Sequence, residues 1–178
     1  DGVCGNDHNT RWFGADRETD ATCRDRFGAC LDQALRGEPQ HWADSDRGLV
    51  ALVVLLDQFT RNVYRGTGRA FSGDERALAL AQDAIDSDRH LDLPAIHRVF
   101  LYLPLEHCED LETQDRCVAL FQALERRMAQ PQFSGFTRYA VAHREVIARF
   151  GRFPHRNALL GRRSSPAELA YVEEHGGF

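Results

Sequence analysis

The chain contains no lysine. All 22 of its basic residues are arginine, against 27 acidic residues. Schiff-base enzymes, pyridoxal enzymes and lysine-dependent phosphate loops are therefore excluded, because each of them needs a lysine amine. The net charge of −5 also excludes a strongly cationic surface. We expect no nucleic-acid partner, because such partners are held mainly by clustered positive charge.

Long apolar runs and paired cysteines are also lacking. The longest apolar run, Leu49 to Leu56, is far shorter than the roughly 20 residues that a membrane-spanning helix needs. The five cysteines form no CxxC pair. Cys23 and Cys30 would lie two turns apart on one helix, roughly 10 Å, which is too far for a disulfide. The sequence therefore predicts reduced thiols in a soluble cytoplasmic protein without a membrane partner.

Apolar residues recur three and four positions apart through nearly the whole chain, whereas strand signals are scarce. This spacing, with its capping residues and Gly and Pro stops, predicts an all-α fold. We expect one domain over 1–178, atypical or truncated at 1–11, in which antiparallel helical hairpins stack as a tetratricopeptide-repeat-like superhelix or bundle. The expected helices cover about 17–36, 45–62, 72–89, 94–107 and 134–150, with one more beginning at a Thr113 cap and one at Ser165; capping boxes are expected at Ser72/Glu75 and Ser165/Glu168.

Two polar clusters follow apolar helix segments. In the first, Asp57 and Arg61 are spaced to pair, as are Gln58 and Asn62. It is equally typical of a helix C-terminus and of a polar site. The second follows Pro104, which predicts a helix kink. A kink that presents polar groups slightly favours a site over a solvated helix end. The polar residues of this second cluster are Glu106, His107, Glu109 and Asp110.

The third cluster is a single residue and the fourth is a loop. His143 lies in the middle of an apolar stripe from Phe136 to Phe150, so we expect it to be buried. A buried histidine is more often a hydrogen-bonded core residue than a ligand, and its partner should come from the first or second cluster. The loop 151–157 carries two arginines, a histidine and an amide, which suit a carboxylate or phosphate: Arg152, His155, Arg156 and Asn157.

Three segments of the chain resemble one family. "LLDQFTRNVYRGTGRAF", "FLYLPLEHCEDL" and "HREVIARFGRFPHRNALLGRRSSPAE" are similar to motifs of the bacterial DUF924 family, and the resemblance extends from about Trp12 to Glu173. Thr60 stands where the family usually has proline, and Cys108 where it usually has serine. The resemblance implies an all-helical, tetratricopeptide-repeat-like fold and a shared set of motif positions. On this chain these are Asp57, Gln58, Phe59, Arg61, Asn62, Glu106, His107, Glu109, Asp110, His143, Arg144, Arg152, Phe153, His155, Arg156 and Asn157.

Two functions fit these residues. The first is a binding module that holds an anionic small molecule or a peptide carboxylate, with no cofactor and no metal. Its expected ligand-binding residues are Arg61, Asn62, His107, His143, Arg152, His155, Arg156 and Asn157. The second is an enzyme with a Glu/His acid–base pair and arginine anion clamps, with or without the assistance of a metal. Its candidate catalytic residues are Asp57, Glu106, His107 and His143.

The geometry of these residues separates the two functions. An enzyme requires a histidine within hydrogen-bonding reach of a carboxylate in a closed pocket, whereas a peptide-binding module requires an open groove. Polar groups taken out of water need one another. We therefore expect one shared polar pocket, with side chains of at least three of the four clusters in contact.

Overall fold

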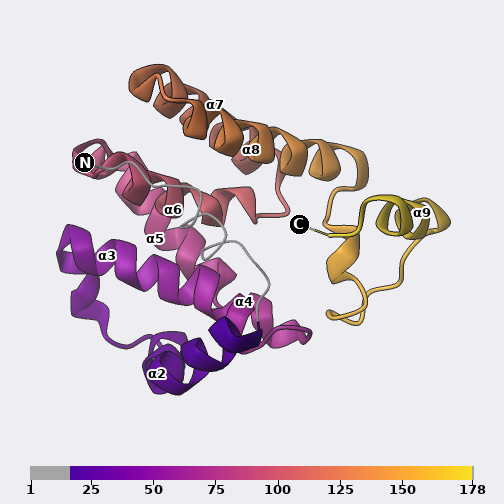
Figure 1. Cartoon of the computed structure of the whole chain (residues 1–178), viewed down its shortest axis with the longest axis horizontal. Helices are drawn as coiled ribbons and strands as arrows, with labels where there is room; N and C mark the ends of the chain where they lie inside the picture. Colours follow the sequence, from indigo (N-terminus) through magenta and orange to yellow (C-terminus); the bar gives the residue numbers. More distant parts are fainter. Residues whose placement is uncertain (1–16, 178) are drawn as a thin grey trace. The chain divides into compact units, whose positions relative to one another are not determined.

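A computed structural model describes residues 17–177, whose regular elements are all helices and which contain no strand (Figure 1). The all-α prediction is confirmed for these residues. The expected atypical segment 1–11 lies outside them. The α-helices are α2 (Arg17–Leu35), α3 (Asp46–Val54), α4 (Thr60–Val63), α5 (Asp74–Asp86), α6 (Ala95–Glu106), α7 (Leu111–Met128), α8 (Pro131–Phe150) and α9 (Pro166–His175). Short 3₁₀ turns connect several of them.

The contacts within the chain form two compact units. The first comprises 1–65 and 69–104, and the second comprises 66–68 and 105–178. The division falls inside α6, between Pro104 and Leu105, and the helix continues through Pro104 to Glu106. The expectation of one domain and of a tetratricopeptide-repeat-like stacking stays a prediction.

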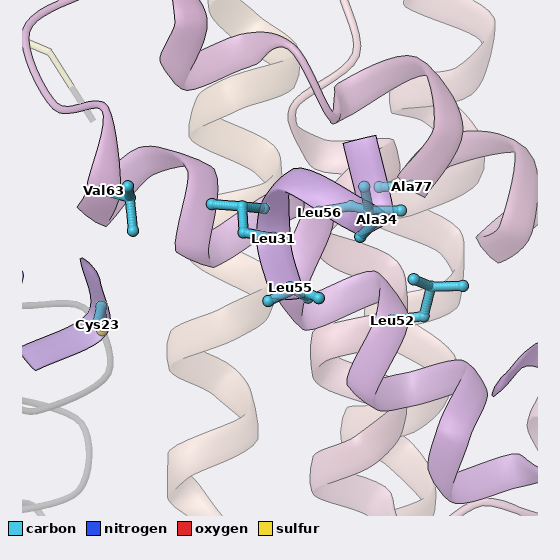
Figure 2. Packing of buried hydrophobic residues seen from close by; sticks show 8 residues of the cluster. All are labelled: Cys23, Leu31, Ala34, Leu52, Leu55, Leu56, Val63 and Ala77. Carbon is cyan, nitrogen blue, oxygen red and sulfur yellow. The ribbon is translucent and has the colours of Figure 1, made fainter. Parts of the chain in front are cut away.

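The core of the first unit is built on the apolar segment that the sequence singled out. Leu52, Leu55 and Leu56 pack against Leu31 and Ala34 of α2 (Figure 2). The expected helix 45–62 is present, but its middle, Leu55–Phe59, forms one wide π-helical turn. Such turns insert an extra residue per turn and occur often at functional sites. Asp57 lies in this turn and is buried.

Two of the predicted helix starts were wrong, for identifiable reasons. The Ser72 hydroxyl donates to the Arg69 carbonyl, and α5 begins after Gly73 instead. A Cβ at Gly73 would lie 2.2 Å from the Leu56 carbonyl oxygen, so only glycine fits this position. Thr113 does not cap α7, because the Asp110 side chain accepts from the Thr113 N–H and makes Asp110 the N-cap.

The second unit contains a helical hairpin and a capped terminal helix. Helices α7 and α8 pack side by side, joined by a short connection in which Ala129 has a positive φ (Figure 1). The predicted capping box at the start of α9 is confirmed: Ser165 accepts from the Glu168 N–H, and the Glu168 side chain accepts from the Ser165 N–H. No helix in 17–177 is long and apolar enough to cross a membrane.

Candidate functional site

A carboxylate and two imidazoles meet in the second unit. Glu106 is the last residue of α6, His107 follows it, and His143 lies midway along α8. Neighbouring residues within a helix point about 100° apart. Because α6 ends at Glu106, the side chain of His107 need not keep this 100° separation from the side chain of Glu106. Side-chain ligand atoms of all three residues lie within 4.8 Å of one another.

Glu106 and His143 are both buried and form the closest contact of this centre. Glu106 is 4% exposed and His143 is 4% exposed. The Nδ1 atom of His143 lies 3.4 Å from Glu106 Oε1 and 2.9 Å from the Tyr139 carbonyl oxygen. A carbonyl oxygen can only accept, so Nδ1 carries the hydrogen in this bond and Nε2 carries the lone pair. The predicted burial of His143 is confirmed, and of the two clusters that could supply its polar neighbour, the second does so through Glu106.

The surroundings of His143 keep its ring uncharged. Burial is the largest cause that lowers the pKa of His143, to about 3, and the nearby charge of His107 lowers it further. The Tyr139 hydrogen bond acts in the opposite direction, and Arg156 and His155 lower the pKa again. The imidazole is therefore neutral at physiological pH.

The charge of Glu106 also acts on a thiol. Burial raises the pKa of Cys117 well above its usual value, and the negative charge of Glu106 raises it further. Cys117 therefore stays a protonated thiol. None of the four cysteines in 17–177 is in a disulfide, which confirms the prediction of reduced thiols for these four; Cys4 lies outside the described residues.

Gln114 of α7 holds the backbone in place at Glu106 and His107. Its side chain is fully buried. Its amide nitrogen donates to the Glu106 carbonyl at 2.6 Å and to the Cys108 carbonyl at 2.8 Å, one bond on each side of His107. No group in the described part of the chain donates to Gln114 Oε1. The sequence carried no signal for this role, because a glutamine in a helix is ordinary.

The loop 151–157 is tied to the centre mainly through its backbone and one arginine. Phe153 stacks edge-on against His143, with ring centroids 5.6 Å apart. The Arg156 guanidinium lies 4.4 Å from the centre of the Phe153 ring and donates to the His107 carbonyl at 3.0 Å. Glu109 accepts from the Phe153 N–H at 2.8 Å. Members of the second, third and fourth clusters are thus in contact, as predicted.

Most of the polar loop residues are engaged by partners that the sequence did not reveal. Arg152 makes two hydrogen bonds to the Glu168 carboxylate, at 2.6 and 2.9 Å, and Asn157 also donates to Glu168 at 3.3 Å. Burial raises the pKa of Glu109, but two bonds from Arg162 and the bond from Phe153 outweigh it, so the net shift is downward. Arg162 and Glu168 lie outside the loop in sequence, and this separation concealed their roles.

The first cluster makes its described contacts within the first unit. Arg61 pairs with Asp57, as predicted, and forms a two-pronged bond with Asp74. The expected Gln58–Asn62 pair is wrong, because both side chains bond to aspartates instead. Gln58 donates to Asp57 at 2.5 Å, and Asn62 donates to Asp20 at 2.8 Å. Asp20 and Asp74 are partners that sequence analysis missed.

The family model of a bacterial protein of unknown function, DUF924, matches residues 4–176. The chain belongs to the DUF924 family. This DUF924 chain is also similar to a solved structure of a protein of unknown function, ATU0120, from Agrobacterium tumefaciens. The two are 37% identical, with a TM-score of 0.83 over 96% of this chain and 90% of the other. No curated protein matches it.

Proposed function

We propose that this DUF924 protein is an enzyme whose reactive groups are Glu106, His107 and His143, and whose substrate is a small anionic molecule. The observation that carries the proposal is the buried contact of 3.4 Å between Glu106 Oε1 and His143 Nδ1. Carboxylates and imidazoles brought together out of water are the groups that enzymes use for proton transfer and for holding a catalytic metal. This contact supplies the histidine and carboxylate that an enzyme requires, and the closed pocket around them stays a prediction.

The arrangement of the arginines bears on the substrate. Arg61 and Arg152 bind carboxylates of the protein itself, which weakens the proposal of a binding module clamped by many arginines. Arg156 differs, because its guanidinium donates to the His107 carbonyl and its positive charge lowers the pKa of His143. A positive group beside the centre supports an anionic substrate, such as a small carboxylate or phosphate monoester. The α7–α8 hairpin also supports, as a proposal, the tetratricopeptide-repeat-like stacking.

The test is a turnover assay on a defined panel of small mono- and dicarboxylates and phosphate monoesters, followed by mass spectrometry. We expect the wild-type chain to convert at least one compound. Glu106→Gln should slow that conversion at least about 100-fold, because acid–base or metal-bound groups contribute that much or more. Glu145→Gln, on the exposed side of α8, is the matched control and should keep full activity. Conversion that survives Glu106→Gln would contradict the proposal, as would a panel that yields no product.

A further inference from the structure

We infer that Glu106, His107 and His143 form a binding site for one divalent first-row transition-metal ion. The inference deepens the proposed function, since it assigns a cofactor to the same site. It rests first on the set of groups. Two imidazoles and one carboxylate form the ligand set of many catalytic zinc sites and of non-haem iron sites, and both leave coordination positions open for water or substrate.

The distances fit such an ion after a small adjustment. Ligand atoms bound to zinc at about 2.1 Å in a tetrahedron lie about 3.4 Å from one another. The ligand atoms of the three residues lie within 4.8 Å of one another, so the widest pair must close by about 1.4 Å. Side-chain rotations provide that movement, and half-buried His107 has the most room to rotate. Within 17–177, this is the one group of three such residues that is gathered closely enough.

The hydrogen bonds behind the ligands are those of a metal site. A metal-bound histidine almost always donates its second ring N–H to a carbonyl or carboxylate, which fixes the ring and directs the other nitrogen to the metal. His143 does this with the Tyr139 carbonyl at 2.9 Å. Gln114 holds the backbone on both sides of His107 through the carbonyls of Glu106 and Cys108. Two consecutive ligands are thereby fixed by one fully buried side chain.

The type of ion follows from the ligands. Imidazole nitrogens favour zinc, cobalt, iron and nickel, whereas magnesium and calcium prefer sites made only of oxygen. Spacing alone does not point to a metal, because adjacent Glu and His residues with a third ligand on a distant helix match none of the known ligand motifs. The site depends on α6 ending at Glu106 and on α8 packing beside that end. Both features exist only in the folded chain, so sequence spacing alone does not reveal the site.

Metal binding is tested on the full chain after chelator treatment and dialysis, with Co²⁺ and Zn²⁺ as probes and Mg²⁺ as a comparison. We expect one Co²⁺ or Zn²⁺ per chain by calorimetry and elemental analysis, and no binding of Mg²⁺. Loss of a supporting hydrogen bond alone weakens metal binding about 10- to 100-fold. Glu106→Gln and His143→Ala remove ligands, so they should weaken binding at least about 100-fold. The matched control is His175→Ala, an exposed histidine of the same unit, which should bind as wild type does.

His107→Cys provides a readout that a change in folding cannot imitate. With a thiolate at position 107, the Co²⁺ form should gain a thiolate-to-cobalt charge-transfer band in the near ultraviolet. The wild-type Co²⁺ form should lack this band. Its presence in the wild type would show that a cysteine is a ligand and overturn the ligand set of Glu106, His107 and His143.

The remaining outcomes separate this inference from the proposed function. If the wild type binds neither ion, or binds one equally well after Glu106→Gln, the metal site is refuted, and turnover by the chelator-treated chain still decides whether the centre is catalytic. If one ion binds at these residues but no compound of the panel is converted, the metal site stands and the proposed substrate class falls.

Discussion

At the scale of single residues, His143 separates a structural role from a functional one. Its Nδ1 contacts Glu106 and the Tyr139 carbonyl. Tyr139 lies four residues before His143, so its carbonyl is also the usual helical acceptor for the His143 backbone N–H. If the imidazole is present mainly to hold a ligand, it is a burden on the metal-free protein, since functional groups are often kept at a cost in stability.

We therefore predict different effects for two substitutions in the chelator-treated chain. His143→Leu fills the space with apolar atoms and should leave the free energy of unfolding unchanged or higher. His143→Ala leaves a cavity and a buried carboxylate without its imidazole neighbour, and should lower it by about 1–3 kcal/mol. Urea unfolding measures both. A Leu variant as unstable as the Ala variant would show that the ring itself supports the fold.

Sequence reasoning succeeds for single residues where periodicity decides. The spacing of apolar residues around His143 was sufficient to predict its burial, but it left the partner open between two clusters. It fails where a partner comes from a distant segment. Nothing in the sequence links Arg152 to Glu168, Arg162 to Glu109 or Gln114 to two carbonyls, because each contact exists only after helices pack.

At the scale of elements, the start of α9 illustrates what local sequence can specify. Its capping box was predictable because all of its hydrogen bonds lie within four residues. The starts of α5 and α7 were not, because a close approach to the Leu56 carbonyl sets the first and competition between Asp110 and Thr113 sets the second. The π-helical turn at Leu55–Phe59 likewise has no sequence signature.

We predict that Ser165→Ala destabilises α9 by about 1 kcal/mol, the usual effect of losing an N-cap side chain. The Ser165 hydroxyl accepts from the Glu168 N–H at 3.3 Å, and alanine cannot replace it. Hydrogen exchange resolved by mass spectrometry should show faster exchange in 166–175. Slower or unchanged exchange there would contradict the role of this cap. The exposed Ser87→Ala, which interrupts only a bond to the Asp83 carbonyl, is the control.

We expect the attachment of the 151–157 loop to α9 to weaken at acidic pH. Hydrogen bonds from Arg152 and from the Ser165 N–H hold the pKa of Glu168 far below its usual range. A carboxylate whose pKa is lower in the folded than in the unfolded chain contributes stability above the unfolded pKa of about 4.3 and loses it as the pH falls below that value. We predict that Glu168→Gln lowers stability at neutral pH and flattens its decline below about pH 4.3. Unfolding curves across this range measure the effect, and parallel declines in both proteins would contradict it.

At the scale of the whole molecule, α6 decides whether the two compact units unfold as one. They share this helix, which runs unbroken across the division at Pro104 and Leu105. Residues Val99 and Leu101 on one side, and Leu105 on the other, are buried. A helix cannot lose one half without exposing the backbone and side chains of its remaining end. We therefore expect the shared helix to couple the unfolding of the two units.

We predict a single cooperative thermal transition, in keeping with the expectation of one domain from sequence. Trp42 lies in the described part of the first unit, so the fluorescence of a Trp12→Phe variant reports on that unit alone, whereas far-ultraviolet circular dichroism reports on helices of both units. Coincident transitions by the two probes are the test of two-state behaviour.

Zn²⁺ at about 100 times its Kd should stabilise the folded, zinc-binding protein by about 2.7 kcal/mol. Because the proposed ligands lie in the second unit, a coupled molecule must transmit this stabilisation to the tryptophan signal, and the two melting curves should shift together. A zinc shift seen by circular dichroism but not by fluorescence would show that the units unfold independently.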